Sequence, residues 1–182
     1  MVEDARSLRA DARRNRARVL QAAAQLFSTE GLSVPVQAIA RRAGVGTGTV
    51  SRHFPTKEGL FEAILAQRMT ELVDHADRLV DREPAGVAFF SFFSVVVHAG
   101  ATDRGLADRL AVAVGDREGL GERIGADVLC DRLGAVLDAA QQAGAVRPGV
   151  TLADVEALMV ACMTRADSLE EIIAVVTTGL RS

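Results

Sequence analysis

Residues 36–57 read VQAIARRAGVGTGTVSRHFPTK and contain two short helical runs on either side of a glycine. Apolar residues recur at helical spacing in each run, and Val50 and Phe54 lie four residues apart on the inner face of the second. Gly44 stands where a helix end requires a positive φ, which glycine adopts without steric cost. The pattern predicts a helix-turn-helix.

The outer face of the second run is expected to carry small, polar and cationic side chains, with no carboxylate among them. Small residues let a helix approach a duplex closely, and Arg, His and hydroxyl groups can bond phosphates or base edges. We therefore expect a DNA-binding face. The alternative is a helical bundle without a DNA role, because glycine turns between helices are common. The outer residues are Thr47, Gly48, Thr49, Ser51, Arg52 and His53.

Five short segments at fixed spacing carry a family resemblance. They are Ile39-Ala40, Ala43-Gly44-Val45, Gly48-Thr49, His53-Phe54 and Lys57-Glu58, within a gapless stretch from near Arg13 to near Leu65. On these residues the chain resembles the N-terminal domain of the TetR family of bacterial transcriptional repressors. Two positions depart from the usual pattern. Pro35 stands where a Thr often caps the helix, and Ser51 stands where a Tyr often contacts phosphate.

The resemblance implies which residues of this face contact bases and which contact phosphates. The implied base contacts are Thr47, Gly48 and Thr49 at the start of the recognition helix, with Gln37 of the preceding helix able to reach a base edge. The implied phosphate contacts are Ser51, His53 and Lys57. Arg52 is poised for either kind of contact, and Arg42 is implied as a phosphate neighbour.

Composition favours an all-α fold of one or two domains. The chain has 182 residues, of which 49% are hydrophobic, and strand-type alternation is hard to find. Residues 1–60 hold ten Lys+Arg against five Asp+Glu, whereas residues 61–182 hold eleven against nineteen. A basic front on an acidic body indicates a polyanionic partner for the front alone.

The domain organisation is expected to follow from the helix-turn-helix. We expect a flexible N-terminal arm over residues 1–12, a helix-turn-helix DNA-binding domain over 13–58 and a helical regulatory and dimerisation domain over 59–182. The helices predicted beyond the turn run from 57 to about 80, from 84 to 98, from 102 to about 114 and from 117 to 143.

Two further helices are predicted from their caps. Thr151 can cap one of them, with Asp154 three residues on, and Ser168 with Glu171 would form a capping box for the other. Apolar residues occupy more of the surface of both helices than the core of one chain would cover, so we expect these helices to pair with their copies in a second subunit. Packing within one chain is the alternative, and the resemblance favours the homodimer. The expected interface residues are Val155, Leu158, Met159, Cys162, Ile172, Ile173 and Val176.

The resemblance also implies a small-molecule effector that releases the protein from DNA. Without Tyr or Trp an aromatic cage is not expected, so the predicted effector is apolar or mixed in character. The candidate walls, each of which could equally be plain core, are Met69, Leu72, Phe89, Phe90, Phe93, Val97, Leu129 and Leu133, with His98 and Arg109 as polar anchors.

Other function classes lack a pattern in this sequence. No nucleophile–base pairing, phosphate loop or metal-ligand spacing stands out, so we expect that the protein is not an enzyme and binds neither a metal nor a cofactor. Cys130 and Cys162 lie in apolar contexts, consistent with reduced thiols in a cytoplasmic protein, and no signal core or long apolar run predicts a membrane partner. An activator, a regulator responding to a protein and an architectural DNA-binding protein remain alternatives.

Overall fold

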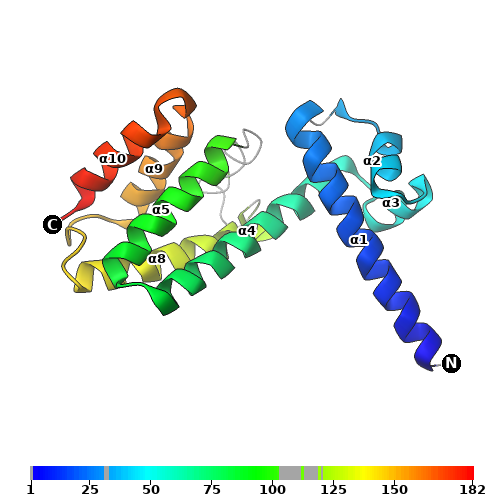
Figure 1. The fold of residues 1–182 in the computed structure, drawn as a ribbon, viewed down its shortest axis with the longest axis horizontal. Helices are drawn as coiled ribbons and strands as arrows, with labels where there is room; N and C mark the ends of the chain where they lie inside the picture. The colour runs from blue at the N-terminus through cyan, green and yellow to red at the C-terminus, as the bar shows by residue number, and fades with distance from the viewer. Residues whose placement is uncertain (1, 31–32, 103–111, 113–118, 120) are drawn as a thin grey trace. The chain divides into compact units, whose positions relative to one another are not determined.

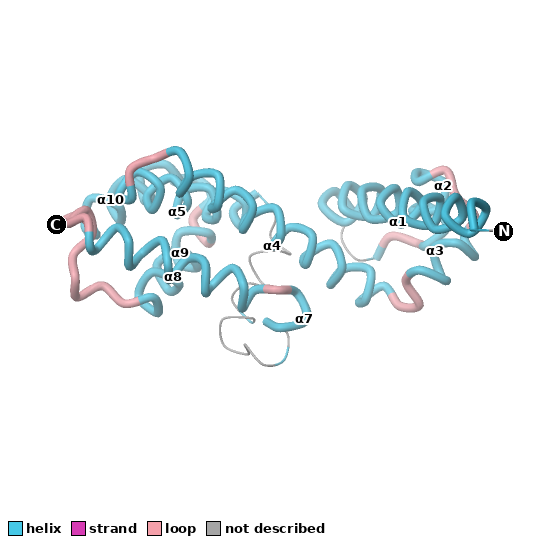
Figure 2. Tube along the Cα trace, turned by 90° about the horizontal axis from the view of Figure 1, so that it is seen from below, coloured by secondary structure: helices cyan, strands magenta, loops and turns pink. Residues whose placement is uncertain are grey.

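The computed structural model describes residues 2–30, 33–102, 112, 119 and 121–182. The secondary structure of these residues is helical, with one isolated antiparallel bridge between Val146 and Arg181. Figure 2 shows the helices joined by loops, without a sheet among the described residues. The all-α prediction is therefore confirmed for the part of the chain that is described.

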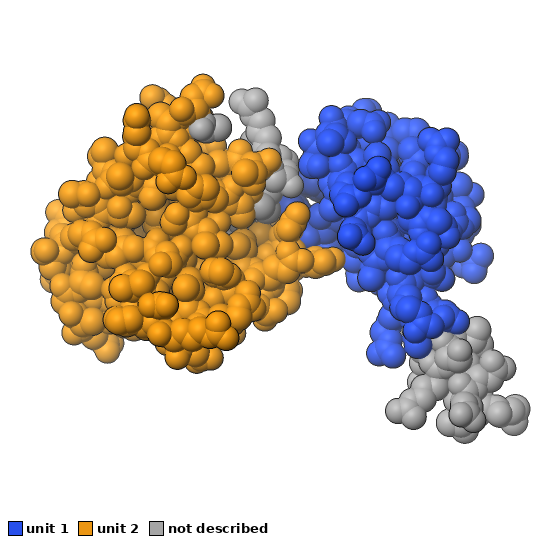
Figure 3. Space-filling model, in the orientation of Figure 1, with its two compact units in different colours: residues 1–65 blue, residues 66–182 orange. Residues whose placement is uncertain are grey.

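The chain divides into two compact units, Met1–Leu65 and Ala66–Ser182 (Figure 3). The division falls inside α4 (Lys57–Arg82), later in the chain than the boundary expected between residues 58 and 59. The first turns of α4 belong to the first unit because Leu60 and Phe61 are buried there, and the Phe61 ring meets Phe27 edge-on at 6.1 Å.

Unit 1 consists of α1 (Val2–Glu30), α2 (Val36–Ala43), α3 (Thr47–His53) and the start of α4 (Figure 1). The long α1 packs against both α2 and α3. Its buried stripe includes Val19, Ala23 and Phe27, which share one helical face. This core is a fixed scaffold on which α3 is mounted.

The N-terminal segment differs from the expected flexible arm. Residues 2–12 continue α1 as helix instead of fraying before Arg13. This segment contains Ala, Arg and Leu but neither Gly nor Pro. Helix propagation from a packed nucleus costs little for such residues, because nucleation is the expensive step.

Unit 2 is organised around α5, whose inner face is entirely apolar. Phe89, Phe92, Phe93 and Val97 are each 0% exposed, and α5 packs against α8, α9 and α10 (Figure 1). The described elements of this unit are the rest of α4, α5 (Ala85–Thr102), α7 (Glu122–Ile124), α8 (Ala126–Gln142), α9 (Leu152–Met163), the 3-10 helix η3 (Ala166–Ser168) and α10 (Leu169–Leu180).

By length and composition alone, α5 could also cross a membrane. Its mean hydropathy over 18 residues is 1.6, and 39% of that window is buried inside the protein. The packing against three other helices accounts for the same composition, because the core helix of a bundle is apolar on most sides.

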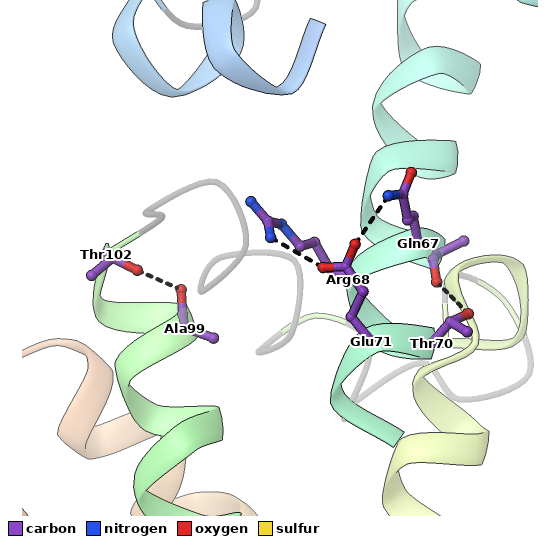
Figure 4. A network of polar contacts seen from close by, with 7 residues as sticks. Gln67, Arg68, Thr70, Glu71, Ala99 and Thr102 are labelled. Atoms are coloured by element: carbon purple, nitrogen blue, oxygen red, sulfur yellow. Dashed lines mark hydrogen bonds and ion pairs between the residues drawn. The ribbon is translucent and has the colours of Figure 1, made fainter. Parts of the chain in front are cut away.

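The part of α4 that belongs to unit 2 carries a network of polar contacts (Figure 4). Glu71 accepts hydrogen bonds from Gln67 at 3.0 Å and from Arg68 at 3.1 Å, and Asp77 pairs with Arg132 of α8. Pairs three and four residues apart stabilise a helix by about 0.2–0.5 kcal/mol each. They support the continuous helical conformation of this part of α4.

One long predicted helix is broken in the structure. The helix expected over 117–143 is interrupted at Gly125, which separates α7 from α8 with φ 71°. A residue in the left-handed region ends a helix, and glycine adopts that region at no steric cost. The sequence pattern missed this break because apolar residues continue on both sides of the glycine.

The predicted caps have different outcomes. Thr151 and Asp154 form a reciprocal capping box, as Thr151 accepts from the Asp154 N–H at 3.1 Å and Asp154 accepts from the Thr151 N–H at 2.9 Å. The box predicted at Ser168 is wrong, because η3 precedes α10 and Ser168 makes no side-chain cap bond.

The helix predicted to end at His98 continues to Thr102. The Thr102 hydroxyl donates to the carbonyl oxygen of Ala99 at 3.2 Å, inside its own helix (Figure 4). It also donates to the carbonyl oxygen of His98 at 2.9 Å. The prediction that Thr102 caps the next helix stays a prediction, because the residues that follow it are not described. The helix expected over 102–114 otherwise lies almost entirely outside the described residues.

Candidate nucleic-acid interface and buried cavity

The turn between α2 and α3 has the geometry that its sequence predicts. Gly44 has φ 64° and ψ 40°, and its N–H donates to the carbonyl oxygen of Arg41 at 3.2 Å. The Val45 N–H donates to the carbonyl oxygen of Ala40 at 3.0 Å. These two bonds form a Schellman motif, which satisfies the last carbonyls of α2 and redirects the chain.

Two apolar residues fix the inner side of α3. Val50 is 1% exposed and Phe54 is 7% exposed, and they lie one helical turn apart. Their burial turns the opposite side of the helix to solvent. Thr47, Gly48, Ser51 and Arg52 are exposed there, while Thr49 and His53 are half-buried at its edges.

Arg52 lies along its own helix. Its Nε donates to the carbonyl oxygen of Gly48 at 3.1 Å, which leaves its terminal nitrogens for other partners. Gly48 adds no side chain to this surface, and a Cβ built there would meet Arg52 Nη2 at 3.7 Å. The outer side of α3 is therefore polar and cationic, and no side chain protrudes from it at Gly48.

The predicted residues outside α3 lie on α2 and α4. Gln37 and Arg42 of α2 are exposed, and Arg42 Nε donates to Gln25 Oε1 of α1 at 2.8 Å. Lys57 is half-buried at the start of α4, where Thr56 caps the helix by accepting from the Gly59 N–H at 3.0 Å. Residues 31–57 contain no Asp or Glu, so no acidic side chain of that segment opposes a polyanion.

Sequence reasoning did not find that α1 arginines support the turn. The guanidinium of Arg16 lies over the Phe54 ring at 5.2 Å, a cation–π contact at the end of α3. Arg18 Nη2 donates to the carbonyl oxygen of Gly44 at 3.4 Å, at the C-terminus of α2. A cation there meets the negative end of the helix dipole. The four arginines between Arg13 and Arg18, in the middle of α1, were the sequence signal for these contacts, but they did not identify the partners.

Unit 2 contains a small apolar cavity between α5, α8 and α9. Its volume is about 40 Å³, and its wall includes one acid, Glu156, which is 5% exposed. The sequence pattern had not marked Glu156, because a lone acid on an apolar helix is ordinarily a solvent-facing residue. The lining residues are Phe92, Val96, Leu129, Cys130, Leu133, Glu156, Met159, Val160 and Met163.

The predicted effector residues are dispersed in the structure. Leu129 and Leu133 line the cavity. Phe90 is half-buried, with the Arg181 guanidinium 4.3 Å from its ring centre. Arg109 lies outside the described residues. Met69, Leu72, Phe89, Phe93 and Val97 are buried core residues away from the lining of this cavity.

His98 connects α5 to α10 and is not part of the cavity wall. Its Nε2 lies 2.7 Å from Glu170 Oε1, and its Nδ1 lies 2.7 Å from the carbonyl oxygen of Ser94. The bond to Glu170 raises the pKa of His98 most, and the bond to the Ser94 carbonyl raises it further. Both ring nitrogens face acceptors, so the arrangement favours the imidazolium.

The sign of the pH dependence follows from this raised pKa. The folded-state pKa of His98 lies above its unfolded value of about 6.5. The stability from the His98–Glu170 pair is therefore fully present below about pH 6.5 and is lost as the pH rises through the folded-state pKa. The pair is largely exposed, so its contribution is small.

The predicted interface residues divide into buried and accessible ones. Val155, Met159, Cys162 and Ile173 are buried within the chain itself, at 0–7% exposure. Leu158, Ile172 and Val176 are half-buried, and Val175, which sequence reasoning missed, is 71% exposed. Ile172, Val175 and Val176 share one face of α10 at the spacing i, i+3, i+4.

Cys130 and Cys162 are both buried, and neither forms a disulfide. Burial raises the pKa of the Cys162 thiol, which disfavours the reactive thiolate. Among the described residues no group of three or more His, Cys, Asp or Glu side chains could hold a metal ion.

Comparison with known proteins covers both units. A family model described as bacterial regulatory proteins, tetR family, matches residues 19–64. A model described as transcriptional regulator SbtR-like, C-terminal domain, matches residues 84–182.

Two solved structures resemble the chain over nearly its whole length. A TetR transcription regulatory protein from Mycobacterium vanbaalenii is 45% identical, with a TM-score of 0.74 over 96% of this chain and 99% of that one. A TetR transcriptional regulator from Streptomyces coelicolor is 30% identical, with a TM-score of 0.69 over 91% and 98%.

Curated relatives match over a shorter stretch. An HTH-type transcriptional regulator of Staphylococcus aureus strain USA300 is 32% identical over 75 residues, which are 41% of this chain and 40% of that protein. The match thus spans about 40% of the length of such relatives.

Proposed function

The chain belongs to the TetR family of bacterial transcriptional regulators, and we propose that it is a cytoplasmic repressor that binds a pseudo-palindromic operator as a homodimer and is released by a small molecule. The observation that carries the proposal is the outer side of α3. Val50 and Phe54 anchor the helix, and its exposed residues are small, polar or cationic. Such a helix can enter a major groove without steric or electrostatic conflict.

In this proposal the residues of the interface have separate roles. Thr47, Gly48 and Thr49 lie against base edges, with Gln37 reaching a further base. Ser51, His53 and Lys57 contact phosphates, Arg52 serves either role and Arg42 neighbours a phosphate. Phosphate contacts position the protein and base contacts select the sequence.

A homodimer is proposed because one recognition helix reads too few base pairs. A two-fold dimer places two α3 helices about one helical turn apart, roughly 34–36 Å or somewhat more. The accessible face of α10, formed by Ile172, Val175 and Val176, supports the pairing, together with Leu158 of α9. Val155, Met159, Cys162 and Ile173 are assigned instead to the core that holds these helices.

The apolar cavity of unit 2 is proposed as the starting point of the effector site. Its volume of about 40 Å³ is far below the roughly 300–1,000 Å³ of ordinary ligand pockets, so a larger effector must widen it. Widening displaces α9, which also carries Leu158. The effector would act by binding the released geometry better than the operator-bound one.

A genome-wide footprint of the bound protein tests the DNA-binding proposal. We expect protected sites that share a pseudo-palindrome, with half-sites separated by about one helical turn. Protection that is scattered, without a shared sequence, would favour an architectural DNA-binding protein. Increased transcription of the adjacent genes on binding would identify an activator instead of a repressor.

A further inference from the structure

A solvent-open groove lies between α1 and α2 in unit 1, apart from the outer side of α3. Its volume is about 320 Å³. Arg18, Gln21 and Gln25 of α1 form one wall, and Arg42 of α2 forms part of the other. Ala22 and Ala43, each 4% exposed, also line the groove.

The lining is unusual in its charge. Two guanidinium groups and two carboxamides line the groove, and no carboxylate does. Within the described residues neither Arg18 nor Arg42 has an acidic partner, and Asp11 of the same helix α1 is paired with Arg14. Two like charges that share a groove repel each other unless an anion lies between them.

Each guanidinium makes one hydrogen bond within unit 1. Arg42 Nε donates to Gln25 Oε1 at 2.8 Å, and Arg18 Nη2 donates to the carbonyl oxygen of Gly44 at 3.4 Å. Each contact uses one of the five N–H donors of a guanidinium, so the remaining donors are available to a ligand. Gln25 accepts through Oε1, which leaves its amide N–H groups as donors beside the same groove.

We propose that this groove binds a phosphate group between Arg18 and Arg42. A guanidinium presents paired N–H donors whose planar geometry matches two oxygens of a phosphate. The phosphate belongs either to the operator backbone or to a free phosphate-bearing molecule. The first source rests on the proposed DNA-binding function, and the second does not.

The position of the groove gives its occupant a structural consequence. Arg18 contacts Gly44, the residue that turns the chain from α2 into α3. A bound phosphate neutralises the repulsion between Arg18 and Arg42 and thereby holds α1 on the C-terminal end of α2. The ligand thereby restricts the orientation of the recognition helix α3 without contacting that helix.

The first arm of the test uses operator DNA and the full-length chain. The variant Arg18→Gln/Arg42→Gln is compared with a charge-matched control, Arg14→Gln/Arg41→Gln. The control also removes two positive charges from unit 1, but neither of its residues lines the groove. For a backbone phosphate, the plot of log K against log salt flattens by about 0.9 more in the groove variant than in the control. The variant Arg18→Lys/Arg42→Lys, which keeps both charges, restores most of the slope.

The second arm uses inorganic phosphate without DNA. At matched ionic strength, phosphate in place of chloride raises the Tm of the wild type if the groove takes a free phosphate. The rise is lost in Arg18→Gln/Arg42→Gln and retained in the control.

A difference between groove variant and control in either arm supports the site and identifies its source. Equal behaviour of the two variants in both arms overturns the site. If wild-type protein binds no duplex, the proposed function fails, and the phosphate arm still decides the groove.

Discussion

Two glycines four residues apart should respond to the same substitution in opposite directions. Gly44→Ala forces alanine into the left-handed region, at a cost of about 1–2 kcal/mol. The new Cβ would collide with Arg18 Nη2, so that flexible side chain must move away. The lower entropy of the unfolded chain returns about 0.4–1 kcal/mol, which leaves a net destabilisation of about 1 kcal/mol.

Gly48→Ala should instead stabilise unit 1. Gly48 lies inside α3 with no left-handed φ, and its Cβ would meet Arg52 Nη2 at an ordinary 3.7 Å. Replacing a helical glycine by alanine gains about 0.5–1 kcal/mol. The two variants should therefore differ by roughly 1.5–2 kcal/mol, which hydrogen exchange of the α2 and α3 amides in the full-length chain can measure.

In Gly48→Ala, operator affinity and stability should change in opposite directions. The added methyl group of Gly48→Ala occupies space that the duplex needs, so operator affinity falls while exchange protection rises. Equal signs of the stability change in the two variants would refute the assigned backbone conformations. Unchanged affinity in Gly48→Ala would refute the close approach of α3 to DNA.

The remaining predictions concern unit 2. Replacing His98 by Gln should reduce the free energy of unfolding most below about pH 6.5, by up to about 1 kcal/mol. The difference from wild type, measured by denaturant titration, should shrink as the pH rises. A difference that grows with pH would mean that the pKa of His98 is lowered in the folded protein. Leu158→Asp/Val175→Asp should give monomers by light scattering, because two charges would enter the proposed interface; a persistent dimer would place that interface elsewhere. Thr151→Ala should cost about 1 kcal/mol because the α9 cap is removed, and unchanged denaturant unfolding would count against the cap.

Local spacing was enough to predict the helix-turn-helix from sequence. Val50 and Phe54 lie one helical turn apart and are both buried, and Gly44 adopts the positive φ that its place between two helical runs predicts. The cap at Thr151 could be predicted for the same reason, because Thr151 and Asp154 lie within one helical turn of each other.

The organisation of unit 2 was harder to predict because its helices are apolar on several faces. On α9, Val155 and Leu158 look alike in sequence, yet one is fully buried and the other is accessible. Periodicity cannot rank the faces of such a helix, so interface and core candidates were mixed. The burial of Glu156 depends on packing between α5, α8 and α9, which no local pattern encodes.

We propose that the outer side of α3 lies in a duplex groove, with Arg52 and Lys57 near phosphates. The decisive experiment measures operator affinity as a function of salt for wild type and for Arg52→Ala/Lys57→Ala. We expect weaker binding by the variant and a slope of log K against log salt that is less steep by about 0.9 for each phosphate that the variant no longer neutralises. An identical affinity and slope for the two proteins, or no salt-dependent binding of any duplex by the wild type, would contradict it.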